Sequence, residues 1–500
     1  MLTRLKVNGF KNLVDTDVRF GPFTCIAGAN GVGKSNLFDA ICFLSALSEK
    51  TLVEAARSVR DEEGHTTDIR SLFHRVGEQY DSEMSFEAEM IVPRAGIDDL
   101  GQEAKASMTF LKYHLVIAYK ENGSKSSSNP LEIRKEELTH ITFGEAGKHL
   151  LFPHSKEWRT SVVQGKRRTP FLIFTIEPED RNSPGIYLFP DGRRGRMLRG
   201  DAMNLPRTVL STVNTAESPT VLLAKREMQS WRLLQLEPSA LRRADVFNGP
   251  DHIQTNGSHL AATMTRLADN EEDGNQIFGQ IAVRLSELIN DVREVSIDRD
   301  ERRELLTVQV TGHDKTIYPA HALSDGTLRF LALAVLELDP EALGVLCLEE
   351  PENGIHPERI PAMLRLLQDI ANDPTVPIGP DNPLRQVIIN THSPAVVAQV
   401  PDDSLLIAEA KEMLRSGQRF KRVVFSSLED TWRTRSDNEA DVVSRGTVLS
   451  YLDSVEKQGT ETEFLFAGST DPHTQHNGIP RRVIDREEIQ EALSESGVLM

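Results

Sequence analysis

The eight residues from Gly28 to Ser35 constrain this chain more than any other stretch. They read GANGVGKS and match the pattern G-x-x-x-x-G-K-[ST]. The apolar run FTCIA before them predicts a buried strand, and the pattern from Ser35 to about Leu47 predicts a helix. A strand, a glycine-rich loop and a helix in this order are typical of the phosphate-binding unit of an α/β protein.

The chemistry of such a loop gives its residues separate tasks. The glycines let backbone N–H groups turn inward around phosphate oxygens, and the following helix adds its positive N-terminal end. Lys34 would reach the β- and γ-phosphates, and the Ser35 hydroxyl would ligate Mg²⁺. The sequence therefore predicts a site for a nucleoside triphosphate with Mg²⁺, formed by Asn30, Gly31, Val32, Gly33, Lys34, Ser35 and Asn36.

A second segment, far downstream, places acids at the end of a predicted strand. The apolar run from Val345 to Leu348 ends in Glu349 and Glu350. Acids at the carboxyl end of a parallel strand suit a ligand site at that edge of the sheet. One carboxylate would hold the Mg²⁺ shell, and the next would orient or deprotonate an attacking water. A solvated acidic turn is the alternative interpretation.

Two more segments point to the same kind of site. The predicted strand 387–390 ends at His392, which beside a phosphate would contact its γ group. Without that neighbour, a histidine here would be an ordinary structural residue. Ser324 precedes an apolar helix as an N-cap, and with Gly326 it would present an exposed helix N-terminus to another phosphate.

Taken in order, GANGVGKS, LSDGTLR, LEEPENGIHP and INTHSP resemble the motifs of an ATP-binding-cassette (ABC) ATPase of the SMC/RecF-like kind. The nearest subgroup is the AAA-family ATPases related to the OLD family. The resemblance covers about residues 1–50 and 230–410. It implies an α/β fold: a P-loop NTPase head of ABC type with two lobes, a mixed core sheet, an antiparallel β subdomain and an inserted α/β or helical arm.

The resemblance also implies roles. ATP and Mg²⁺ would be the cofactors, with Lys34, Glu350 as base and His392 as switch histidine forming the catalytic set. Ser35 and Glu349 would bind the metal, although Glu349 stands where many cassettes have Asp. Ser324 and Gly326 would be signature residues that complete the nucleotide site of a second subunit. An ATP-dependent homodimer or higher oligomer follows, while the family's Q-loop glutamine has no clear match.

Charge and spacing suggest a division of the chain. The segment 151–250 carries 16 Lys/Arg against 10 Asp/Glu, a net +6 in a chain of −18. The cluster from Lys166 to Arg199 would contact double-stranded DNA; a solvated face with acidic neighbours is the alternative. We expect an N-terminal lobe with the P-loop and the antiparallel β subdomain at 1–145, an inserted basic arm or lid at 146–255, a C-terminal lobe with the remaining motifs at 256–415, and an extension ending in a polar, mobile tail at 416–500.

Composition excludes several classes of protein. The net charge of −18 argues against a general nucleic-acid coat protein, and no apolar run approaches a membrane span. Three cysteines cannot build a disulfide framework, so we expect a cytoplasmic protein. About 100 residues after Pro394 lack clear strand-end acids, so no nuclease is expected in this chain.

Three functions remain open. The first is the sensor or regulatory ATPase of a DNA-maintenance or anti-phage defence system with a separate effector such as a nuclease. The second is a RecF-like DNA-repair ATPase that binds DNA itself. The third is a nucleotide-gated scaffold with little turnover, against which the intact Lys34, Ser35, Glu350 and His392 argue.

Overall fold

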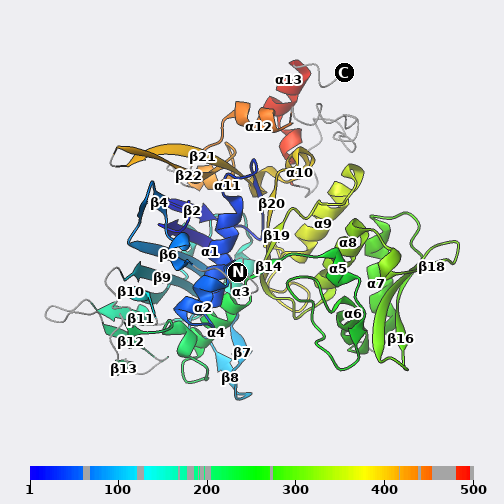
Figure 1. The fold of residues 1–500 in the computed structure, drawn as a ribbon, viewed down its shortest axis with the longest axis horizontal. Helices are drawn as coiled ribbons and strands as arrows, with labels where there is room; N and C mark the ends of the chain where they lie inside the picture. The colour runs from blue at the N-terminus through cyan, green and yellow to red at the C-terminus, as the bar shows by residue number, and fades with distance from the viewer. Residues whose placement is uncertain are drawn as a thin grey trace.

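The computed structural model places three sheets side by side, with helices between and around them (Figure 1). It describes residues 1–59, 68–120, 129–166, 169–176, 185–189, 191, 196–197, 204–270, 274–415, 417–436, 441–452 and 480–495.

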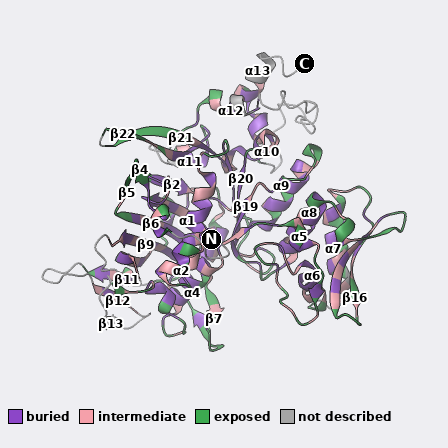
Figure 2. Ribbon diagram, viewed as in Figure 1, coloured by how far each residue is buried: buried purple, intermediate pink, exposed green. Residues whose placement is uncertain are grey.

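The core sheet carries the motif segments. Its five parallel strands are followed by one antiparallel strand, in the order β14 (Arg232–Leu234), β19 (Gly344–Glu349), β20 (Arg385–Thr391), β3 (Phe23–Ala27), β21 (Leu405–Arg415) and β22 (Gln418–Ser427). Every residue of β3 and β20 is buried. Figure 2 shows buried residues, in purple, in the region of β19 and β20 at the centre of the molecule. Parallel strands covered on both faces read as continuous apolar runs, which is why the sequence revealed them.

A separate antiparallel sheet is built mostly from the N-terminal part of the chain. Its eight strands are, in spatial order, β13 (Arg196–Met197), β12 (Gly185–Leu188), β11 (Phe171–Ile176), β10 (Leu131–His140), β9 (Phe110–Tyr119), β6 (Glu83–Ile91), β1 (Leu2–Asn8) and β2 (Thr16–Arg19). Helix α1 (Lys34–Leu47) packs in the same apolar core as this sheet, with α2 (Leu52–Arg57) and α4 (Pro219–Gln229). Two small hairpins, β4–β5 (Arg75–Val76, Gln79–Tyr80) and β7–β8 (Ala95–Ile97, Glu103–Lys105), lie outside the eight-stranded sheet.

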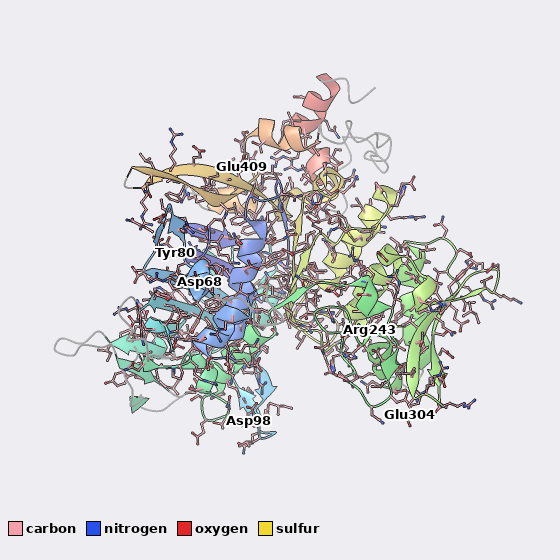
Figure 3. All side chains as sticks on the ribbon, viewed as in Figure 1. Asp68, Tyr80, Asp98, Arg243, Glu304 and Glu409 are labelled. Atoms are coloured by element: carbon pink, nitrogen blue, oxygen red, sulfur yellow. The ribbon has the colours of Figure 1, made fainter. Side chains whose placement is uncertain are left out.

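The third sheet lies on the opposite side of the molecule, where Glu304 marks the turn between its two longest strands (Figure 3). It contains β15 (Asp245–Val246), β16 (Glu294–Asp300), β17 (Leu305–Thr311) and β18 (Ile317–Pro319). The helices of this side are α5 (Pro238–Leu241), α6 (Leu260–Asp269), α7 (Gly274–Ser286), α8 (Asp325–Leu338) and α9 (Ile360–Ile370). The remaining helices are α3 (Lys156–Val162), α10 (Pro394–Gln399), α11 (Trp432–Ser436), α12 (Arg445–Leu452) and α13 (Glu487–Glu495).

Two apolar cores meet at the core sheet. Ile26 and Cys347 face the core that contains α1, whereas their neighbours Cys25 and Leu348 face the core that contains α8 and α9. This alternation places the sheet as the wall between two lobes. The expected α/β fold with a mixed core sheet and an antiparallel β subdomain is therefore confirmed.

The segment 146–255 contributes described strands to three of the sheets. Its described strands β11–β13 extend the antiparallel sheet, and β14 joins the edge of the core sheet. The net charge of this segment does not encode which strands pair. The packing is made by short apolar runs that include buried Leu172 and Ile173. Pro219 and Pro238 begin helices at the first turn, where a missing N–H costs nothing. The four-part division stays a proposal.

The basic cluster and the C-terminal tail lie only partly within the described residues. In the basic cluster, Arg167, Arg168, Arg193, Arg194 and Arg199 lie outside the described residues. In the C-terminal tail, residues 480–495 are described, and they pack on the C-terminal lobe through buried Val483, Ile484 and Ile489. Three apolar side chains of this part therefore belong to a core, and the mobility expected of the tail stays a prediction. In the described part of the chain, no helix combines the length and apolar character needed to cross a membrane.

Candidate functional site

Three adjacent parallel strands deliver the motif residues to one edge of the core sheet. Strand β20 lies between β3 and β19, with Ala27 opposite Thr391 and Asn390 opposite Glu349. The residues that follow these strands therefore emerge side by side, although they are far apart in the sequence.

Asn12, in the turn between β1 and β2, binds the P-loop through its side chain. Its side-chain amide donates to the Val32 carbonyl at 3.0 Å, and its Oδ1 accepts from Asn36 Nδ2 at 2.7 Å. Gly33 has φ 109°, and a Cβ at this position would overlap the Asn12 side chain. Glycine is thus required at 33 by both backbone conformation and contact.

Lys34 points into the loop that carries it. Its Nζ donates to the carbonyls of Gly28 and Ala29 at 2.6 and 3.0 Å. Burial lowers the pKa of Lys34, and the nearby Glu350 and Glu349 only partly offset this. The lysine side chain is therefore folded back onto its own loop, where two backbone carbonyls hold the ammonium.

Glu350 is the most constrained acid of the site. Its carboxylate accepts from Asn353 Nδ2 at 2.9 Å and lies 2.7 Å from His392 Nδ1. Burial raises the pKa of Glu350, but hydrogen bonds from Asn353 and His392, with the charges of His392 and Lys34, hold it below its ordinary value. Its φ of 47° is rare outside glycine, and such strain is found at functional sites.

An open cavity of about 520 Å³ joins these groups. It is lined by Asn30, Gly31, Gly33, Lys34, Ser35, Asn36, Glu349, Glu350, Asn353 and Asn390. The Ser35 hydroxyl and the Glu349 carboxylate are oxygen donors of the kind that Mg²⁺ takes. The donor set therefore fits a phosphate chain accompanied by a magnesium ion.

The predicted signature residues lie elsewhere. Ser324 caps α8, accepting from the Thr327 backbone N–H, and is exposed. Gly326 is buried against Gly354, where a Cβ would overlap the Gly354 carbonyl oxygen. Neither is among the described residues that line the cavity. Val32 and His392 are also outside that lining, although Val32 bonds to Asn12 and His392 to Glu350.

The sequence left several neighbours of the site unidentified. Gln235 follows β14, whose Leu234 is paired with Leu348, so it emerges beside Glu349. With Glu349 and Glu350 it lines a second cavity of about 260 Å³. Asn12 belongs to no quoted motif, whereas Asn353 lies in LEEPENGIHP, Asn390 in INTHSP and Gln235 in WRLLQLEPSALRR, so for these three the sequence offered a signal.

Two family models match the chain on either side of residues 162–223. The first is described as "AAA domain" and matches residues 4–161. The second is described as "AAA domain, putative AbiEii toxin, Type IV TA system" and matches residues 224–398. Together they contain every motif segment of the site.

Among curated proteins, a DNA replication and repair protein RecF from Phocaeicola vulgatus is 35% identical over 63 residues. The match spans 12% of this chain and 17% of that protein.

Solved SMC head domains are similar at low identity. The head bound to the C-winged helix domain of ScpA is 14% identical (TM-score 0.42), with 86% of this chain and 98% of that chain covered. The head domain from Thermotoga maritima is 11% identical (TM-score 0.35), with 86% and 99% covered. The head with an extended coiled coil from Pyrococcus furiosus, bound to the C-terminal domain of ScpA, is 12% identical (TM-score 0.37), with 86% and 96% covered.

These TM-scores lie below 0.5, so the fold assignment rests on the strand order and register given above. One AAA-domain match contains the P-loop, and the other contains the acidic end of β19. The partial similarity to RecF is consistent with both matches. Over two separate segments the chain is therefore similar to AAA-domain proteins, and over 63 residues it is similar to RecF, in line with the expected resemblance to ABC-type ATPases of the SMC/RecF-like kind.

Proposed function

We propose that this chain binds ATP with Mg²⁺ and hydrolyses it. The observation that carries the proposal is the single cavity lined by Lys34, Ser35, Glu349 and Glu350, with His392 bonded to the last of these. Phosphate-binding and water-activating groups rarely converge in this way without a shared substrate.

The residues divide the work of the reaction. Lys34 and the N–H groups of the loop would hold the β- and γ-phosphates. Ser35 and Glu349 would hold Mg²⁺, which when bound neutralises phosphate charge. Glu350 is ionised at neutral pH, since its pKa is held low, and would orient and deprotonate the attacking water. Gln235 is our candidate for the Q-loop glutamine, because the β14–β19 register puts it beside Glu349.

We further propose that ATP joins two copies of the chain. Ser324 and Gly326 lie outside the lining of the cavity in their own chain, and Ser324 is exposed at a helix N-terminus. A second subunit would supply them to the γ-phosphate, so that hydrolysis releases the dimer. Such a protein is a nucleotide-driven switch.

The biological role proposed is that of a sensor or regulatory ATPase in DNA maintenance or anti-phage defence, with a separate effector protein such as a nuclease. The RecF match and the toxin–antitoxin name of one family model support this direction. The alternative is a RecF-like ATPase that binds double-stranded DNA directly through the cluster from Lys166 to Arg199. A nucleotide-gated scaffold with little turnover is the third candidate.

Steady-state ATP hydrolysis of the full chain, with and without linear double-stranded DNA, tests these proposals. We expect Lys34→Ala to lower turnover by about 100-fold or more, because a phosphate clamp is lost. Exposed Lys421→Ala is the matched control and should keep the parent rate. Stimulation by DNA would favour direct DNA binding; lysine-dependent hydrolysis that ignores DNA would favour a protein trigger. Hydrolysis unaffected by Lys34→Ala would refute the site.

A further inference from the structure

A buried acid beside the site has no part in the mechanism above. Glu352 is 8% exposed and follows the strained Glu350 by two residues. Titratable groups from several elements face it: Cys25 on β3, Lys34 on α1, Glu350 after β19 and His392 after β20. Its carboxylate lies at the carboxyl end of β20, where it contacts Thr391, the last residue of that strand.

The contacts of Glu352 lead to the turn that carries His392. The hydroxyl of Thr391 donates to Glu352 Oε1, and the same hydroxyl oxygen accepts from the Ser393 backbone N–H at 2.9 Å. Thr391 is fully buried, so its hydroxyl has one donor role and one acceptor role, both satisfied within this turn. Glu352 thus holds the Thr391 hydroxyl, which in turn binds the backbone N–H on the far side of His392.

The second carboxyl oxygen of Glu352 has a different environment. Oε2 is buried and has no hydrogen-bond partner among the described residues. A buried polar atom without a hydrogen-bond partner lowers the stability of a fold. If the hydrogen bond to Thr391 served stability alone, an uncharged side chain would make it at a lower cost. A residue kept at such a cost calls for a functional explanation.

We propose that Glu352 is a positioning residue for hydrolysis: through Thr391 it fixes the turn 391–393 and so aligns His392 with Glu350. The inference rests on the proposed ATPase function. In the described hydrogen bonds Glu352 meets Thr391 and not the P-loop. Its loss should therefore change the rate of the chemical step and leave nucleotide binding intact.

Two pairs of variants test the alignment. Glu352→Leu and Thr391→Val remove the hydrogen bond, and we expect each to lower kcat at least about tenfold with KM for ATP within about twofold of the parent. Glu352→Gln and Thr391→Ser keep an acceptor and a hydroxyl, and we expect their kcat to stay within about threefold. Glu358→Gln, exposed in the same part of the chain, is the control.

A double-mutant cycle shows whether the effect passes through His392. In a His392→Ala background, Glu352→Leu and Thr391→Val should cost nothing further, because the group they align is gone. Multiplied losses, a raised KM with unchanged kcat, or parent turnover in both Glu352→Leu and Thr391→Val would each overturn the inference. If Glu352→Leu does not fold, Thr391→Val carries the cycle alone.

Imidazole NMR of selectively labelled histidine separates this inference from the proposed function. We expect the His392 signals to shift in Thr391→Val and to match the parent in Thr391→Ser. A parent without Lys34-dependent hydrolysis would end the proposed function, while shifted His392 signals would still support the alignment. Unchanged His392 signals in Thr391→Val would overturn the alignment whatever the hydrolysis rate.

Discussion

The six-stranded core sheet and the eight-stranded antiparallel sheet differ in where their polar residues lie. In the core sheet, strands β3, β19 and β20 are almost entirely buried, and the candidate site residues lie at or just after their carboxyl ends. In the antiparallel sheet, polar residues sit within the strands, and one of them, Glu136 on β10, is fully buried. The comparison teaches that the candidate site gathers where parallel strands end, whereas Glu136, within a strand, bonds to neighbouring segments of the fold.

The largest expected effect concerns the core sheet. Glu350→Gln keeps the shape of the side chain and removes the base, so we expect turnover to fall by about 100- to 1,000-fold. Binding should remain, and the ATP-bound dimer should accumulate in light scattering after gel filtration. Hydrolysis at the parent rate would show that the strand-end acid is not the base.

The next prediction addresses the antiparallel sheet. Glu136 accepts from the backbone N–H groups of Val209 and Leu210 and from the Tyr113 hydroxyl. Burial raises its pKa to about 7 despite those donors. Because the folded pKa lies above the ordinary value, the stabilisation by the uncharged carboxyl is full below about pH 4.5 and is lost as the pH rises through about 7.

Glu136→Gln cannot ionise and should therefore not show this loss. We expect the free energy of unfolding of the parent to fall, relative to that of the variant, by up to about 3 kcal/mol between these pH values. Urea denaturation at acidic and mildly alkaline pH measures the difference. If the unfolding free energies of the two proteins changed in parallel with pH, Glu136 would not titrate in this range. A changed ATP affinity in Glu136→Gln would show that the antiparallel sheet also affects the nucleotide site.

The smallest effect lies where the two regions touch. Asn12 leaves the antiparallel sheet through the β1–β2 turn and bonds to Val32 and Asn36 of the P-loop. Asn12→Ala removes two hydrogen bonds, and we expect KM for ATP to rise about threefold to tenfold, the equivalent of roughly 1 kcal/mol. Exposed Asn8→Ala, on the preceding strand, should leave KM unchanged. An unaltered KM in Asn12→Ala would show that the P-loop keeps its form unaided.

The two sheets also differ in how far sequence predicts them. Strand β3, helix α1 and the ends of β19 and β20 follow from continuous apolar runs next to glycine or acids, because both signals are local. The places of Asn12 and Gln235 depend on pairing between segments far apart in the chain, which no local pattern encodes.

The burial of Glu136 is a second feature that the local sequence does not reveal. In the strand LEIRKEELTH it looks like one polar residue among several, and only the segment around Val209 and Leu210 folding over it makes it buried. The same limit applies to the strand pairing of residues 146–255. Their charge was visible in the sequence, whereas the open edge of β10 that β11 occupies was not.

The position of β3 has a consequence for synthesis on the ribosome. This strand is made among the first 30 residues, yet its two partners are β20 and β21, which end at Thr391 and Arg415. Both of its edges must stay unpaired until most of the polypeptide has emerged, while the ladders that join β1, β2, β6, β9 and β10 to one another lie within the first 140 residues. The nascent chain therefore carries an exposed, apolar strand for most of its translation, and its yield should depend strongly on chaperones that shield such edges.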